Sequence, residues 1–385
     1  MAKLIAIEWD ANEARVIVGR SRGKELAIDD AFGVAVPRDA VAGDEASVGQ
    51  ALAAELRRRG HGKADALVGV GRASIELRKI QLPPAPDAEL PDMVRFQAMR
   101  QFTTIGDDWP LDFVPLASTE TAVEVLAATL SPQIVAQLKA VCAACDLSPK
   151  RLLLRPFSAA SLLIRSNPED RRVRLVLDLL ASDADLFVIA DGSVAFMRTV
   201  RIPSLDAGEA VRAAALLGET RRTIAAAQSQ LGGRRIEAIS VFGDADRHRD
   251  LLDHFQKQLE LPIDCADPFA LVDASFEWRA EPPENSGRFA PLLGMLIDEV
   301  RDGRHAIDFL SPRKRPVPKS ARERYLAYTA LAIAAGCLFA LLVKFQLDRE
   351  NRIIGELTAE LKSLKTNVDA VKKRESHFKQ VEQFA

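Results

Sequence analysis

The chain has 385 residues, of which 28% are charged, and its formal net charge is −2. This balance excludes the strongly basic surface that general nucleic-acid binding requires, so we expect no nucleic-acid partner. Four scattered cysteines are too few for a disulfide framework, which indicates a reducing compartment. Residues 1–10 include Lys3, Glu8 and Asp10 and have no long apolar run, so we expect no cleaved signal peptide.

The first part of the chain alternates apolar runs with polar turns. Runs at 4–7 and 16–18, followed by a turn at Gly23, predict a meander of three strands. A helix over 48–59 and a strand over 66–70 are expected next.

A similar opening returns about 170 residues later. Its first strand ends at Asp178, as the earlier one ends at Glu8, and Gly192 again marks a glycine turn. The repetition predicts an internal duplication with an acid at the end of each first strand.

This duplication resembles the actin-like ATPase fold, in which two acidic turns face each other across a nucleotide cleft. The resemblance implies an α/β fold with two similar halves over residues 1–305, on the cytoplasmic side. Between the halves, a strand leading to LPP, an acidic helix, an Asp–Phe strand and a strand–helix–strand that ends in RPF follow one another. This order is similar to the small α+β subdomain inserted in PilM-like pilus assembly proteins, so we expect such a subdomain at about 72–157. The PilM resemblance extends over residues 3–297.

The loops of the expected cleft depart from an active ATPase. Actin-like ATPases place a glycine two residues after each acid, because backbone amides must approach the phosphates closely there. This chain has Asp10 and Leu180 at those positions. Arg15 stands where PilM-like proteins have a lysine, and the third loop, VFGDAD, keeps only Gly243.

A carboxylate repels a triphosphate and a leucine fills a phosphate loop, so we predict a pseudo-ATPase with no catalytic residue and no bound cofactor. The vestigial cleft is expected to consist of Glu8, Asp10, Arg15, Asp178 and Gly243. The structural alternative is that the two acids only end strands and cap turns.

No other catalytic or metal site is predicted. The five histidines show no metal-ligand spacing. Cys142 and Cys145 form a CxxC pair late in an expected helix, without a second pair to complete a zinc site, so we interpret them as small buried residues.

Residues 306–324 join the domain to an apolar stretch. The segment Ile307, Asp308, Phe309, Leu310 is similar to the INLLP segment of PilN-like membrane proteins, with Asp308 in place of asparagine and Ser311 inserted before the proline. In that family the segment docks on PilM, so we expect Ile307, Phe309 and Leu310 to occupy a groove of the domain. The alternative is that they form the last strand of the domain's own sheet.

The stretch from Leu326 to Val343 has no charge and would be about 27 Å long as a helix, enough to cross a bilayer. We predict a transmembrane helix over 325–346, with Tyr325 and Tyr328 at the interface. A buried core helix is the alternative. The denser basic flank precedes the span, which predicts a single-pass inner-membrane protein with a cytoplasmic N-terminal domain.

Residues 347–385 show apolar side chains in a heptad pattern, which predicts a coiled coil outside the membrane and hence a homodimer or heterodimer. Glu350 and Glu375 interrupt the seam. Within the span, Ala332, Gly336 and Ala340 form a small-residue face that suits membrane-helix packing. The resemblance implies a small ferredoxin-like domain after Ala385.

Two functions from different classes stay open. The first is a platform scaffold of a type IV pilus or a type II secretion machine. Its partners would be PilN/PilO-like membrane proteins and a cytoplasmic motor ATPase, and the secretion protein GspL shares its overall plan. The second is a membrane-anchored actin-like ATPase or kinase with an active nucleotide site.

Overall fold

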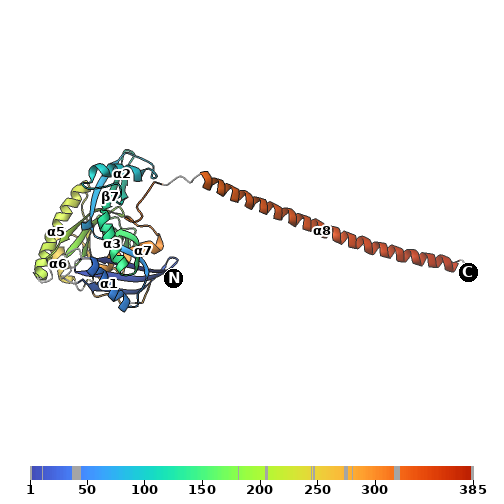
Figure 1. Ribbon diagram of the computed structural model, residues 1–385, viewed down its shortest axis with the longest axis horizontal. Helices are drawn as coiled ribbons and strands as arrows, with labels where there is room; N and C mark the ends of the chain where they lie inside the picture. The colour runs from blue at the N-terminus through green and yellow to red at the C-terminus, as the bar shows by residue number, and fades with distance from the viewer. Residues whose placement is uncertain are drawn as a thin grey trace. The chain divides into compact units, whose positions relative to one another are not determined.

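A computed structural model describes residues 2–10, 12–36, 45–180, 182–203, 207–243, 245, 248–272, 276–279, 281–315 and 321–382, with the backbone alone at 45, 276, 321–328 and 375–382. The chain forms two compact units, residues 1–315 and 316–385, which are described separately (Figure 1).

The first sheet of residues 1–315 has the strand order β14-β3-β2-β1-β4-β8. Strands β1 to β3 form the predicted antiparallel meander, and β4 and β8 continue the sheet in parallel with β1. Their bounds are β1 Ala2–Trp9, β2 Glu13–Arg22, β3 Glu25–Ala35, β4 Ala64–Val70, β8 Leu147–Leu154 and β14 Phe276–Trp278.

The second sheet repeats this order as β11-β10-β9-β12-β13, with the same antiparallel and parallel pairs. Its strands are β9 Arg174–Leu179, β10 Asp183–Ala190, β11 Ser193–Arg201, β12 Ala238–Phe242 and β13 Ile263–Ala266. Gly23 and Gly192 turn the corresponding hairpins with φ of 63° and 74°, conformations that favour glycine. The predicted duplication is confirmed, and the domain has the actin-like fold.

Two helices lie between the sheets. α4 (Arg155–Ser166) contacts strands of both sheets, and α7 (Ala290–Arg301) packs on α4 and on the first sheet. A Cβ on Gly294 would lie 1.9 Å from the Ser158 carbonyl oxygen, so only glycine permits this crossing. The other helices of the two halves are α1 Glu45–Arg58, α3 Pro132–Ala144, α5 Glu209–Gln230 and α6 Arg249–Leu259.

A third, smaller sheet, β5-β7-β6, lies between β4 and β8 in sequence and is covered by α2. Its elements are β5 Ile75–Leu82, α2 Leu90–Gln101, β6 Leu111–Ser118 and β7 Val123–Leu130. The expected subdomain range of 72–157 is wider than this sheet. β8 pairs with β4 and α3 packs on α1, so both belong to the first half.

Helix α3 shows how local sequence sets its boundary. Ser131 accepts the amide of Ile134 at 3.3 Å as an N-cap, and Pro132 occupies the first helical position. Cys142 and Cys145 are buried at its far end, where burial raises their thiol pKa values to about 12 and about 11.

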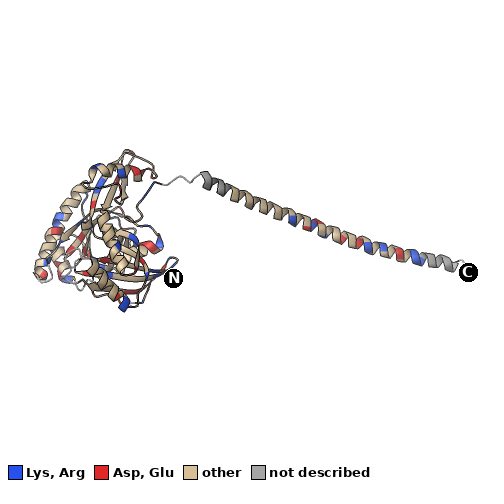
Figure 2. Ribbon diagram, in the orientation of Figure 1, with Lys and Arg blue, Asp and Glu red and all other residues tan. Residues whose placement is uncertain are grey.

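The second unit contains one helix, α8 (Ala321–Glu382). It includes a window of mean hydropathy 2.1, and none of that window is buried within the described residues. By length and composition this helix can cross a membrane. Figure 2 shows that the described side chains of α8 begin with an uncharged portion, which is followed by a portion dense in both signs of charge. The side chains of Tyr325, Tyr328 and Phe378 lie outside the described residues.

Candidate functional site: a closed cleft and an occupied groove

The two acidic turns of the duplicated halves meet directly. Asn12, in the turn after β1, donates from its side chain to the Ser182 hydroxyl at 3.0 Å, and these residues occupy equivalent positions of the two repeats. Glu8 and Asp178, at the strand ends before these turns, are both buried. The space between the turns, where the actin-like resemblance expects phosphates, is therefore bridged by protein.

Asp10 accepts hydrogen bonds from the backbone amides of the first turn. Its Oδ1 accepts the backbone N–H groups of Asn12 at 2.8 Å and Glu13 at 3.1 Å, an Asx-type turn. Burial alone would raise the pKa of Asp10, but Arg15 and these two amides hold it below its usual value. The amides that would face a phosphate therefore already have an anionic partner within the chain.

Arg15 fills the base of the same turn. It pairs across β1–β2 with Glu8, with 2.9 Å between Nε and Oε1, and its Nη1 reaches Asp10 at 3.0 Å and Glu13 at 2.5 Å. The guanidinium is fully buried. Burial opposes its charge, yet the three carboxylates raise the pKa of Arg15 above its ordinary value, so it stays charged. Arg15 is thus held in ion pairs with the carboxylates around it.

Arg155 links the two halves from the start of α4. Its Nε and Nη2 donate to Asp185 Oδ2 at 2.9 and 2.5 Å, and its Nη1 lies 3.7 Å from Glu8 Oε2. Thr199 donates to the other Asp185 oxygen at 2.5 Å. The carboxylates raise the pKa of Arg155 despite the opposing effect of burial. Glu8 of the first half and Asp185 of the second are thereby joined through one cation.

Asp178 differs from the other acids of this cluster. Neither of its oxygens has a hydrogen-bond partner among the described residues, and the side chain is fully buried. Burial is the main cause that raises the pKa of Asp178 to about 8, against the opposing effect of Arg155. The group is therefore mostly protonated and neutral at pH 7.

These residues do not fit a triphosphate. The amides of the first turn donate to Asp10, both arginines are paired with carboxylates, and the side chains of Asn12 and Ser182 bridge the turns. A bound nucleotide would have to displace buried ion pairs, and removing one partner of such a pair typically costs about 3–5 kcal/mol.

The sequence identified Glu8, Asp10, Arg15 and Asp178 but missed Arg155 and Asp185. Asp185 pairs with Asp178 across β9–β10 as Arg15 pairs with Glu8 across β1–β2. Asn12 and Ser182 are 170 residues apart, and the same separation relates Arg15 to Asp185. Aligning the two repeats position by position could therefore have found that acid. Arg155 comes from another element and carries no such signal.

Gly243 lines a cavity of about 780 Å³. The cavity is also lined by Leu180, by residues of α5 and α6, and by the 284–288 segment. Gly243 has φ 153°, and a Cβ there would lie 2.4 Å from the His248 ring. Asp244 and Asp246 of the third loop fall outside the described residues.

The segment after α7 occupies a groove beside β8, the edge strand of the first sheet. Ile307 and Phe309 are buried and belong to the core cluster of the first half, while Leu310 is half-buried. The Phe309 amide donates to the Leu152 carbonyl at 2.9 Å, and one antiparallel bridge joins Asp308 to Leu153. The contact thus combines apolar side chains with a single step of strand pairing.

Asp308 fixes the register of this segment. Its Oδ1 accepts the amides of Leu152 at 3.2 Å and Leu310 at 3.0 Å, and its Oδ2 accepts from Arg151 Nη1 at 3.0 Å. Arg151 also pairs with Glu299 at 3.1 Å. The residue that departs from the INLLP pattern therefore has a cation opposite it.

Asp112 binds the segment from the inserted sheet. Its buried carboxylate accepts the amides of Asp308 at 2.9 Å and Arg313 at 3.1 Å, and also the Arg313 guanidinium at 2.9 Å. Burial raises the pKa of Asp112, although Arg313 and the two amides oppose this. The Arg313 guanidinium lies 5.6 Å from the Phe113 ring centroid. The Asp–Phe pair noted in the sequence thus holds a turn of residues 308–313, a role the sequence did not predict.

No family model and no curated protein matches the chain. Among solved structures, a chain of the PilM-PilN type IV pilus biogenesis complex is similar with 20% identity and TM-score 0.65, over 77% of this chain and 98% of that one. The cytoplasmic domain of EpsL, an inner-membrane component of the Vibrio cholerae type II secretion system, has 12% identity and TM-score 0.45, over 80% and 98%. A Bacteroides thetaiotaomicron protein with an actin-like ATPase fold has 8% identity and TM-score 0.40, over 69% and 91%.

The domain is PilM-like in fold. At these identities the likeness concerns the fold alone.

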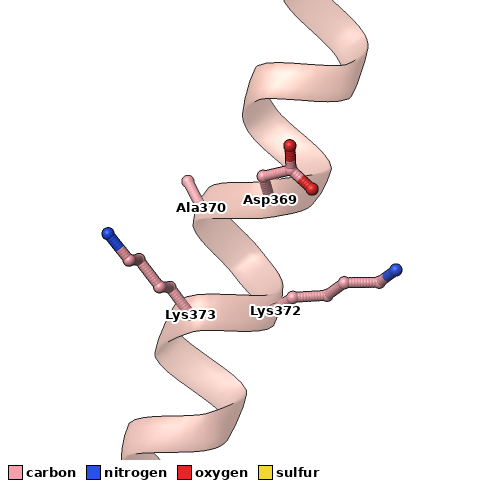
Figure 3. A pocket seen from close by; sticks show the side chains of 4 residues that line it. All are labelled: Asp369, Ala370, Lys372 and Lys373. Carbon is pink, nitrogen blue, oxygen red and sulfur yellow. The ribbon is translucent and has the colours of Figure 1, made fainter.

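The residues predicted for membrane-helix packing lie on α8. Ala332, Gly336 and Ala340 are exposed there. The seam residues of the predicted heptads with described side chains are also exposed: Leu347, Ile354, Leu357, Leu361, Leu364, Val368 and Val371. Farther along, Lys372 and Lys373 extend to opposite sides of the helix (Figure 3). The apolar seam has no partner within the described residues.

Proposed function

We propose that this protein is a membrane-anchored scaffold of a type IV pilus or type II secretion assembly platform that does not hydrolyse ATP. One observation carries the proposal: segment 307–313 is seated on a PilM-like domain and continues, in the same chain, toward a helix of membrane-spanning length. The comparison protein comes from a PilM-PilN complex, which supports PilN-like character for the part of this chain after the domain.

Docking in this chain is intramolecular. Only residues 302–306 separate α7 from the segment, and Arg151 also donates to the Gly303 carbonyl at 3.3 Å within this connection. So short a connection gives the segment a high effective concentration at its own groove and disfavours exchange with a neighbouring copy. The groove thereby ties the domain to its own membrane helix.

Absence of hydrolysis is supported by the closed cleft. Asp10 holds the turn amides, and Arg155 joins Glu8 to Asp185 across the two halves. The competing function is an actin-like ATPase or kinase, and the cavity at Gly243 favours it, because its volume of about 780 Å³ is within the range of ligand sites.

Self-association through α8 is part of the proposal. Counting in sevens from Leu347 places Ala340 on the same seam, and Gly336 falls on the other seam position of that frame. In a parallel pair, Glu360 of one chain would face Lys365 of the other. We further propose a single pass through the inner membrane with a cytoplasmic domain, and PilN/PilO-like proteins and a motor ATPase as partners.

Complementation separates the two functions. In a strain that lacks this protein, the variant Asp112→Ala/Phe309→Ala should fail to restore pilus assembly or secretion, because release of the segment lengthens the tether between the domain and α8. Asp10→Asn keeps an acceptor for the turn amides and should restore it fully. Full activity of the first variant would contradict the docking proposal. ATP-dependent phosphate release by the purified chain would favour the enzyme.

A further inference from the structure

Helix α2 of the inserted sheet carries an apolar surface that its own core does not use. It buries Leu90, Val94 and Ala98 against the inserted sheet. On its outer face, Phe96 is 68% exposed and Met99 is 43% exposed. Among the described residues of 1–315, Val211 on α5 is the only other large apolar side chain exposed to this degree. The pair is thus an exposed apolar feature of α2 that lies outside the core of the inserted sheet.

This face adjoins the point where the chain leaves the domain. Asp92, on the same face of α2, lies 3.2 Å from Arg315 Nη1. The stronger attachment is two residues earlier, where buried Asp112 holds the Arg313 amide and guanidinium. The exit of the chain is thus fixed to the inserted sheet and its helix.

Covalent geometry limits how far this exit can lie from the bilayer. Eight peptide steps separate Arg313 from Ala321, so the two Cα atoms are at most about 29 Å apart in any conformation. Five further helical residues, to Leu326, add about 7 Å. A compact domain of this size is about 50 Å across. With α8 in the membrane, the exit at Arg313 therefore lies within about 36 Å of the start of the apolar stretch, less than the width of the domain.

Cations lie beside the same surface. Arg100 lies with its guanidinium 5.6 Å from the Phe96 ring centroid. The nearby exit carries Arg313, Lys314 and Arg315, and Lys319, Arg322 and Arg324 follow with Glu323 as the only acid among them. Aromatic and apolar side chains beside arginine and lysine are typical of helices that lie in the lipid headgroup region, and clustered cations attract anionic lipids.

We propose that α2 is a membrane-contact helix, with Phe96 and Met99 inserted among the headgroups of an anionic bilayer. The inference rests on the proposed function, because it requires α8 to span that bilayer. The contact gives the domain a second attachment beside its linker and sets which face of the domain is turned toward the cytoplasm.

Site-specific lipid quenching tests the contact on the full-length chain. The protein, with Cys265→Ser and Cys337→Ala, is labelled with an environment-sensitive dye at Met99→Cys and placed in nanodiscs of phosphatidylcholine and phosphatidylglycerol. We expect lipids spin-labelled at the headgroup to quench this dye several-fold more than a dye at Val211→Cys, the matched exposed apolar site. Adding Phe96→Ser to the Met99-labelled chain should reduce the quenching toward the control.

A third label, at Leu331→Cys in α8, distinguishes the two proposals. Strong quenching at Leu331 by lipids labelled in the acyl chain, with Met99 and Val211 equal to each other, would overturn the α2 contact and leave the scaffold function standing. Absence of quenching at Leu331 would overturn the membrane span, and the α2 contact with it. A dye at Met99 shielded from aqueous iodide but not quenched by lipid would assign this face to a protein, against the proposal.

Discussion

The cleft and the groove of this domain both contain buried carboxylates, but the carboxylates have different partners. In the cleft, Glu8 and Asp185 bind the side chains of Arg15 and Arg155, which belong to the fold itself. In the groove, Asp112 binds the backbone amides of a segment that arrives from outside the inserted sheet. Ion pairs within the fold occupy the cleft, whereas Asp112 holds the amides of a segment from another part of the chain.

The largest effect is expected from a substitution of Asp185, which pairs with Arg155 in the cleft. The variant Asp185→Asn leaves Arg155 buried with only Glu8, 3.7 Å away, so we expect a loss of about 3–5 kcal/mol in the free energy of unfolding. Urea denaturation of residues 1–315 measures it. Glu277→Gln, which removes an exposed acid that pairs with Arg279, should cost far less. Equal losses of stability in the two variants would show that the pair of Arg155 and Asp185 does not join the two halves.

Asp178→Asn should act in the opposite direction and depend on pH. The folded-state pKa of Asp178 is about 8, above its ordinary value of 3.8, so the folded state holds a proton that the unfolded state has released. Stability from this group is full below pH 4 and is lost as pH rises through 8. We expect the wild type to lose roughly 3 kcal/mol relative to Asp178→Asn between pH 5 and 7.5. If the free energy of unfolding changed with pH in the same way in both proteins, this would contradict a neutral, unpaired carboxyl at Asp178.

Two acids, Asp112 and Asp92, contact the segment through which the chain leaves the domain, and variants of the two test the role of the groove. Asp112→Ala removes the buried acceptor of the Asp308 and Arg313 amides, which should cost about 2 kcal/mol and raise the exchange rates of these two amides about 30-fold. Hydrogen exchange of the full-length chain measures this. The control, Asp92→Ala, removes only an exposed partner of Arg315 and should leave both rates unchanged. Loss of protection throughout β4 and β8 would instead show that the segment and the sheet unfold together, against a docked segment.

The smallest effect is expected for α8, where two chains would pair through the exposed apolar seam residues. Cysteines at Leu357 and Leu364 should cross-link two copies in membranes, because these positions face the partner in the heptad frame. A cysteine at Thr366, on the outer face of that frame, is the matched control and should not. Equal cross-linking at all three positions would indicate random collision rather than a coiled coil.

The sequence predicted the fold better than it predicted the site. Strand periodicity and the repeated acid at Glu8 and Asp178 were enough for the duplication, because both are local patterns. The pairing of Arg155 with Asp185, and of Asp112 with the amides of Asp308 and Arg313, joins residues from distant elements. Such contacts depend on tertiary packing, which a single sequence does not encode as a spacing.

Calorimetric titration of residues 1–315 with Mg-ATP tests the central claim most directly. With the turn amides bound to Asp10 and both arginines paired, we predict no heat of binding at micromolar protein and at best a millimolar dissociation constant. The variant Asp10→Gly/Leu180→Gly frees the amides of the first turn and should recover weak binding. A micromolar dissociation constant for the wild type would contradict the closed cleft and favour the ATPase.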